Sequence, residues 1–135
     1  YNKTAPYNDI IPTLNKLREK NYKIAVVSNK FDLAVKELCE KYFPCLIDIA
    51  IGENEAAGIN KKPAPDTVNL VLKQLGLTSN QAIYIGDSDV DILTAKNSNM
   101  PCISVTWGFR DREFLLRNNA QVIINEPKEI IDYLR

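Results

Sequence analysis

The chain has 135 residues, enough for one domain of ordinary size, and its 45% hydrophobic and 25% charged residues are typical of a globular protein. Its 17 Lys and Arg balance 17 Asp and Glu, so the zero net charge offers no field to attract nucleic acid or an anionic membrane. No apolar run is long enough to span a membrane, and we expect neither nucleic acid nor membrane among the partners.

Strand-like and helix-like segments alternate along the chain. A helical stripe at Ile10, Ile11, Leu14 and Leu17 comes first, and Asp9 is a candidate for its cap. The apolar, β-branched runs of strand length are Tyr22–Ser28, Leu46–Gly52, Ala82–Asp87, Cys102–Trp107 and Gln121–Asn125. Further helices are expected at Ala34–Tyr42, Val68–Leu75 (stopped by Gly76), Asp89–Lys96, Asp111–Asn118 and Glu126–Leu134.

This alternation predicts an α/β fold in which a Rossmann-like parallel sheet is flanked by helices, within a single domain over residues 1–135. Ligands of such sheets bind at the carboxyl ends of the strands. The polar residues at those ends are therefore the candidates for a site, namely Ser28, Asn29, Glu53, Asp87, Ser88 and Thr106.

The cysteines and the lack of histidine limit which metal sites and catalytic groups the chain can form. The three cysteines, Cys39, Cys45 and Cys102, show no metal-binding spacing, and we expect buried, reduced thiols in a cytoplasmic protein. The chain contains no histidine, which removes the commonest general base and the usual zinc ligand.

Two short motifs place anion-binding groups after apolar segments. In "VVSNK" (Val26–Lys30), the Ser28 hydroxyl could donate a hydrogen bond to an anion, although a plain strand end would look the same. In "NKKPAPD" (Asn60–Asp66), two prolines stiffen the loop that carries Lys62, and Asp66 could cap the following helix. Taken alone, each motif is better explained by ordinary local structure.

The third motif, "IGDSDVD" (Ile85–Asp91), crowds three carboxylates at the start of a helix. Asp89 is explained by helix initiation, where a negative charge is favourable. Asp87 and Asp91 lie four residues apart, so their carboxylates could face one small pocket and hold a hard cation such as Mg²⁺.

In this order, "SN", "KKPAP" and "GDSDVD" resemble the second, third and fourth motifs of the haloacid dehalogenase-like (HAD) superfamily, and Thr106–Ile130 resembles the tail of its phosphoglycolate phosphatase-like branch. The resemblance implies a Mg²⁺-dependent phosphatase that acts on a small phosphorylated metabolite through an aspartyl-phosphate. It assigns Ser28, Asn29 and Lys62 to the phosphoryl group, with Ser28 and Lys62 catalytic, and Asp87 and Asp91 to the metal, where Asp91 could also orient Lys62.

The sequence departs from the family at its first motif. No Asp-x-Asp pair at a strand end precedes Ser28, so the nucleophile strand and the cap domain are missing. Since the chain starts with Tyr1, we expect it to be the C-terminal core portion of a longer phosphatase and to be inactive alone. The family's nucleophile strand lies between the strands ending at Ser28 and Asp87, and we expect these two strands not to pair directly.

Two other interpretations remain open. A phosphoacceptor receiver domain also combines acidic residues, a hydroxyl and Lys-Pro, but it places its acidic cluster first, whereas Asp87 and Asp91 come last here. A noncatalytic α/β ligand-binding or interaction module would explain the missing nucleophile, but it gives no physical reason for the lysine and the carboxylates.

Overall fold

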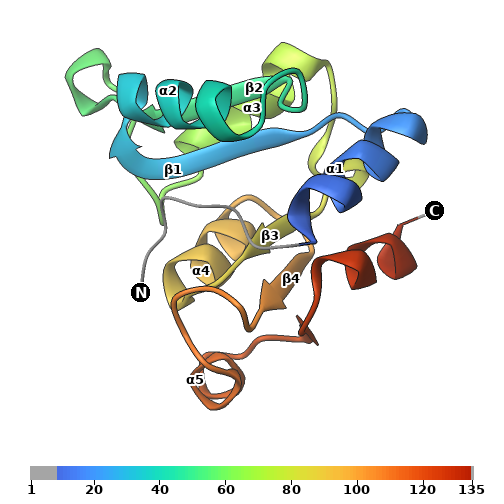
Figure 1. Ribbon diagram of the computed structural model, residues 1–135. Helices are drawn as coiled ribbons and strands as arrows, with labels where there is room; N and C mark the ends of the chain where they lie inside the picture. The colour runs from blue at the N-terminus through green and yellow to red at the C-terminus, as the bar shows by residue number, and fades with distance from the viewer. Residues whose placement is uncertain (1–8, 135) are drawn as a thin grey trace.

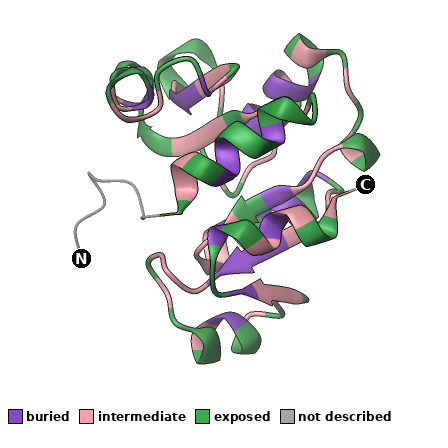
Figure 2. Cartoon of the chain, turned by 45° about the vertical axis from the view of Figure 1, so that its right-hand side comes forward, coloured by how far each residue is buried: buried purple, intermediate pink, exposed green. Residues whose placement is uncertain are grey.

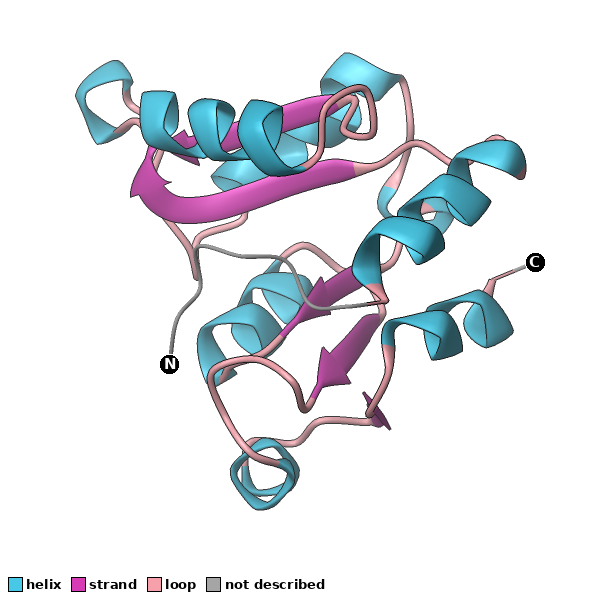
Figure 3. Ribbon diagram, viewed as in Figure 1, coloured by secondary structure: helices cyan, strands magenta, loops and turns pink. Residues whose placement is uncertain are grey.

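Helices and strands alternate in the computed structural model, which describes residues 9–134 (Figures 1 and 3). The strands are β1 (Ala25–Phe31), β2 (Ile49–Glu53), β3 (Tyr84–Gly86), β4 (Cys102–Val105) and β5 (Val122–Ile124). The helices are α1 (Ile10–Glu19), α2 (Asp32–Tyr42), α3 (Asp66–Leu75), α4 (Asp89–Asn97) and α5 (Arg112–Arg117), with short 3₁₀ helices η1 (Glu55–Ala57), η2 (Ser79–Gln81) and η3 (Pro127–Tyr133). The predicted α/β fold is confirmed. Within residues 9–134, no helix has the length and apolarity needed to cross a membrane.

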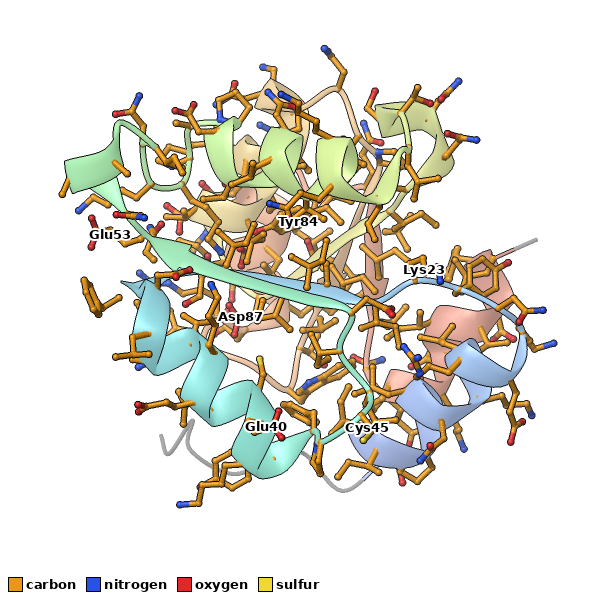
Figure 4. The ribbon with its side chains drawn as sticks, turned by 90° about the horizontal axis from the view of Figure 1, so that it is seen from above. Lys23, Glu40, Cys45, Glu53, Tyr84 and Asp87 are labelled. Atoms are coloured by element: carbon orange, nitrogen blue, oxygen red, sulfur yellow. The ribbon has the colours of Figure 1, made fainter. Side chains whose placement is uncertain are left out.

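The strands pair in parallel, but over the described residues they form two separate sheets. β1 pairs with β2, and β3, β4 and β5 form the second sheet in that order. Seen from above, α2 and α3 lie on opposite sides of β1 and β2 (Figure 4), while α4 packs against β3 and β4. Both faces of the sheet formed by β1 and β2 are therefore covered by helices, as expected for apolar parallel strands.

Two clusters of buried side chains join the sheets. Figure 2 marks the buried residues of the helices and strands in purple. The first links α1 to the second sheet, and its buried members are Leu14, Leu17, Leu46, Ile103, Val105, Ile124 and Ile130. The second gathers Val68 and Leu72 of α3 and Ala95 of α4 around Tyr84 of β3, with Val27 of β1 packed against them. Since Val27 and Tyr84 belong to different sheets, apolar burial and not a backbone ladder holds the two halves together.

β1 and β3 border the division between the sheets, and in the described part of the chain they share no ladder (Figure 1). Ile85 in the middle of β3 is 40% exposed, whereas Ile103, opposite it in β4, is only 3% exposed. An unpaired strand edge keeps its backbone donors and acceptors available and leaves its side chains less covered. The expectation that these two strands do not pair directly is confirmed.

The end of β1 differs from the prediction. The strand runs on to Phe31, so Ser28 and Asn29 lie within it and not beyond its end. The ladder with β2 is interrupted between Val27 and Phe31, and Phe31 then pairs with Glu53. Sequence reasoning ended the strand at the first polar residue, but pairing with β2 carries the extended backbone further.

The predictions for the helix caps at Asp9 and Asp66 are also corrected. Asp9 directly precedes α1, but its side chain makes no capping hydrogen bond. Asp66 is the first residue of α3, and its carboxylate accepts a hydrogen bond from the Asn60 backbone (2.9 Å) in place of capping the helix. α4 begins at Asp89 as predicted, but its cap is Ser88, whose hydroxyl accepts from the Asp91 backbone. Gly76 ends α3 as expected, with a φ of 69° that favours glycine.

The C-terminal segment and the cysteines bring two further differences. Residues 127–133 form the 3₁₀ helix η3, which packs against α1. Cys39 is buried and Cys102 is partly buried, but Cys45 is exposed, so the expectation of three buried thiols is wrong for Cys45. Cys45 has a φ of 64° in the turn after α2, and this turn places it at the surface.

Candidate active site

The carboxyl ends of the strands lie on one side of the molecule. Figure 4 labels Glu53, at the end of β2, and Asp87, directly after β3, toward one end, and Lys23, just before β1, toward the other. In parallel sheets this side is where ligands bind. The polar residues that sequence reasoning selected belong to segments that meet here.

Asn29 and Lys62 lie 33 positions apart and are joined by a reciprocal pair of hydrogen bonds. The Asn29 side-chain amide donates to the Lys62 carbonyl oxygen (3.0 Å), and its oxygen accepts from the Lys62 backbone N–H (2.8 Å). One amide side chain in β1 thus fixes the backbone of the loop that carries the lysine. This use of Asn29 differs from the substrate contact that the resemblance implies.

Ser28 precedes Asn29 and is half-buried. Its hydroxyl oxygen accepts a hydrogen bond from the Lys30 backbone N–H (3.1 Å). A hydroxyl that accepts one hydrogen bond can still donate its own hydrogen to an anion. The two hydrogen bonds between the Asn29 side chain and the Lys62 backbone keep Ser28 next to the lysine-bearing loop.

Lys62, Tyr84 and Asp91 form a compact polar cluster. The Lys62 ammonium donates to Asp91 Oδ1 (2.7 Å) and to the Tyr84 hydroxyl (3.0 Å), and that hydroxyl donates to Asp91 Oδ1 (2.8 Å). The side chains of the ion pair are 12% and 9% exposed. Burial and the hydrogen bonds to Asp91 and Tyr84 fix the ammonium in position.

The second oxygen of Asp91 turns toward the start of α4. Asp91 Oδ2 accepts from the Asp87 backbone N–H (2.9 Å) and from the Ser88 hydroxyl (3.2 Å). Burial raises the pKa of Asp91, but the adjacent Lys62 charge and the donated hydrogen bonds outweigh it and hold that pKa below its ordinary value. Burial, followed by the negative charge of Asp91, raises the pKa of the Tyr84 hydroxyl, which therefore remains protonated. Asp91 is an ionised carboxylate that binds Lys62 on one side and the Asp87 backbone on the other.

Asp87 follows β3 directly, and a glycine lies before it in the chain and another lies against it in space. A Cβ on Gly86 would lie 2.2 Å from the Asp91 Cβ, and a Cβ on Gly108 would lie 2.2 Å from Asp87 Oδ2. Asp87 Oδ2 also accepts a hydrogen bond from the Phe109 backbone N–H (3.0 Å). The close backbone approach explains why glycine occupies both positions.

The donor set fits a hard divalent cation in part. The Asp87 carboxylate lies directly after β3, and its Oδ2 accepts one hydrogen bond from a backbone N–H. Both carboxylate oxygens of Asp91 accept hydrogen bonds from protein donors. Among residues 9–134 no three His, Cys, Asp or Glu side chains gather closely enough to hold a metal ion. Mg²⁺ is often bound through only one or two carboxylates together with water and substrate oxygens, so Asp87 suits it as one ligand.

The structure thus brings Asn29, Lys62, Asp87 and Asp91 into one connected network, with Ser28 beside it. Sequence reasoning missed Tyr84, whose hydroxyl lies between the lysine and the carboxylate. The only available signal was a tyrosine inside an otherwise aliphatic strand. A lysine fixed beside the ionised Asp91 carboxylate, at the carboxyl ends of parallel strands, can stabilise the negative charge of a phosphoryl group.

The parallel α/β fold, with a lysine and acidic residues at the carboxyl ends of its strands, is that of the haloacid dehalogenase-like class. The model of the family described as haloacid dehalogenase-like hydrolase matches residues 1–105, and the chain belongs to that family.

Similar proteins are phosphoglycolate phosphatases. The enzyme of Aquifex aeolicus is 34% identical over 136 residues, an alignment that covers 95% of this chain and 58% of that protein. The enzyme of Aliivibrio fischeri is 32% identical over 129 residues, covering 95% and 56%. A solved structure from Lactobacillus delbrueckii subsp. bulgaricus, of a protein assigned to the phosphoglycolate phosphatases, has a TM-score of 0.90 at 44% identity and covers 93% of this chain and 52% of that one. The chain thus spans about half the length of these relatives.

Proposed function

We propose that the protein containing this chain is a Mg²⁺-dependent phosphatase that hydrolyses a small phosphomonoester through an aspartyl-phosphate. The carrying observation is the Lys62–Asp91 ion pair, with side chains 12% and 9% exposed, next to the backbone of Asp87. Buried ion pairs stabilise a fold poorly, because desolvation offsets much of their attraction. A fixed ammonium at the carboxyl ends of strands is better explained by an anion that it must bind.

Each residue of the network then has a role. Lys62 neutralises negative charge on the phosphoryl oxygens during transfer, and Ser28 donates a hydrogen bond to the same group. Asp91 and Tyr84 orient Lys62 through the 2.7 Å and 3.0 Å contacts, and Asn29 fixes its backbone. Electrostatic stabilisation of this kind is the largest contribution to phosphoryl transfer that these residues can make.

Asp87 would hold the Mg²⁺ ion, with Asp91 supporting it from behind. When bound, the cation would offset charge on the phosphoryl oxygens. The Phe109 backbone N–H on Asp87 Oδ2 and the close approach of Gly108 restrict the orientation of this carboxylate.

The nucleophile would come from a segment outside this chain. Its carboxylate would attack phosphorus, the ester oxygen would leave and take up a proton, and water would then hydrolyse the acyl phosphate to inorganic phosphate. Over residues 9–134, β1 and β3 share no ladder with each other, and this, together with the 40% exposure of Ile85, supports a further parallel strand between the two sheets. A strand there would end beside Ser28 and Asp87.

The substrate is proposed from the relatives. Phosphoglycolate phosphatases match at 30–34% identity, so we assign a small phosphorylated metabolite, with phosphoglycolate as the first compound to test. Two surface hollows, of about 360 and 600 Å³, are lined by residues outside the network, and neither is the proposed substrate site.

The test compares the 135-residue chain with the complete product of its gene. We expect the complete product to hydrolyse phosphoglycolate or para-nitrophenyl phosphate with Mg²⁺, and the short chain to be inactive. Asp87→Asn should abolish turnover, while Asp132→Asn, at an exposed position, should leave it within twofold. An inactive complete product, or turnover by the short chain that survives purification and disappears in Asp87→Asn, would overturn the proposal. The first result would favour a noncatalytic module.

A further inference from the structure

The loop after β4 holds Asp87 through its backbone. The Phe109 N–H donates to Asp87 Oδ2 (3.0 Å), and the Arg110 N–H donates to the Asp87 carbonyl oxygen (3.2 Å). Gly108 lies so close that a Cβ there would be 2.2 Å from both the Cβ and Oδ2 of Asp87. Both the main chain and the carboxylate of Asp87 are therefore held by residues 108–110, a segment that none of the three motifs includes.

Arg110 is held between two aromatic rings. Its guanidinium carbon lies 4.3 Å from the centroid of the Phe109 ring and 4.4 Å from that of Phe114 in α5. Its Nε is buried and has no hydrogen-bond partner in the described part of the chain. A guanidinium stacks well on aromatic faces, so the two ring contacts help to fix this side chain.

The stack connects the loop to a helix. Phe114 lies in the first turn of α5, where its N–H donates to the capping carboxylate of Asp111 (2.9 Å). Leu115, the next residue of α5, is fully buried. Of the two rings that contact Arg110, Phe114 is next to the buried Leu115, and Phe109 belongs to the loop that binds Asp87.

We propose that Arg110 is a positioning residue that acts through the backbone of residues 108–110 to fix the orientation of the Asp87 carboxylate. The proposal rests on the function proposed above for Asp87. The competing interpretation is that the stack only stabilises the C-terminal part of the fold. Local hydrogen exchange and cation affinity distinguish the two, because a purely structural loss would affect the core amides equally.

The test uses the whole chain and two arginine variants. Arg110→Leu removes the stacked cation, while Arg117→Leu removes an arginine whose side chain is 68% exposed, at the other end of α5. Amide hydrogen exchange at Phe109 and Arg110, compared with Ile103 in β4, reports on the loop. A titration with Mg²⁺ alone, followed by the amide chemical shifts of residues 86–91, reports on Asp87.

In Arg110→Leu we expect exchange at Phe109 and at position 110 to accelerate about tenfold or more, while exchange at Ile103 stays within twofold. The Mg²⁺ dissociation constant should rise about three- to tenfold. Arg110→Lys keeps the charge but loses the planar group. Its exchange rates at positions 109 and 110 and its Mg²⁺ dissociation constant should lie between those of the leucine variant and the wild type. Arg117→Leu should change neither measurement.

The positioning role is overturned if Arg110→Leu leaves loop exchange within twofold, or if it accelerates Phe109 and Ile103 equally. It is also overturned if the loop loosens but the Mg²⁺ titration is unchanged. If the wild-type chain shows no Mg²⁺ response at residues 86–91, the proposed metal role of Asp87 fails instead. Hydrogen exchange alone then decides whether Arg110 holds the loop on Asp87.

Discussion

Replacing Asp91 by Asn should strongly destabilise the chain. The amide would still accept from Lys62 and Tyr84, but the charge that balances the ammonium 2.7 Å away would be lost. The Nδ2 group would also face the Asp87 N–H, which now donates to Asp91 Oδ2 at 2.9 Å. One donor would then face another, and the ammonium would lose its counter-charge, in a site where both side chains are little exposed.

The size of the effect follows from this burial. Removing one partner of a fully buried ion pair costs about 3–5 kcal/mol. The side chains are 12% and 9% exposed, so we expect the lower end of that range, about 3 kcal/mol. Since domains are stable by about 5–15 kcal/mol, this is a large fraction, and the melting temperature should fall by about 10 °C.

A double-mutant cycle isolates the pairwise interaction. Urea unfolding at pH 7, followed by circular dichroism, is compared for wild type, Asp91→Asn, Lys62→Met and the double variant, and we expect a coupling free energy of about 1–3 kcal/mol. The control is Lys36→Met, because Lys36 is half exposed in its pair with Asp32. This variant should lose less than about 0.5 kcal/mol of its free energy of unfolding. A Lys62–Asp91 coupling free energy as small as the Lys36 effect would refute the reasoning.

Three further predictions concern pH, packing and thiol reactivity. The pKa of Asp91 is lower in the folded than in the unfolded chain, so its contribution to stability is present above about pH 4 and is lost as pH falls through the folded pKa. In acid unfolding, Asp91→Asn should therefore lose less of its free energy of unfolding over this range than the wild type does. Gly86→Ala places a Cβ 2.2 Å from the Asp91 Cβ and should cost about 1–3 kcal/mol in urea unfolding, whereas an unchanged midpoint would show that the backbone can move away. Cys45 should react with iodoacetamide in the folded chain well before buried Cys39, whose pKa is raised by burial, and equal rates would contradict the described exposure.

The order of elements could be predicted because each apolar run is continuous and each helical stripe is separate. Asp87 could be predicted because it follows a strand whose end meets the other strand ends at one edge of a parallel sheet. Lys62 and Asp91 were predicted from the resemblance of their motifs to the haloacid dehalogenase-like family. The position of Ser28 within β1 could not be predicted, since the strand continues through polar residues while its pairing with β2 persists.

Other contacts in the site could not be predicted, because the types of the residues that make them do not indicate them. The Phe109 and Arg110 contacts to Asp87 come from backbone N–H groups, which every residue except proline carries. Tyr84 looks like an ordinary core residue until its hydroxyl is placed between Lys62 and Asp91. Asn29 was assigned to a ligand, yet its amide binds the Lys62 backbone, because a loop 33 residues away folds against it.

The most direct test of the central claim is the turnover of phosphoglycolate by the complete gene product carrying Lys62→Met, with Lys61→Met as the matched control. Lys61 is exposed, whereas Lys62 is held by Asp91 and Tyr84 at the proposed phosphoryl site. Loss of one group that stabilises transferring charge costs about 10²–10³ in kcat, so we predict a fall of at least about 100-fold for Lys62→Met and less than about twofold for Lys61→Met. Equal turnover in the two variants, with both proteins folded, would contradict the account.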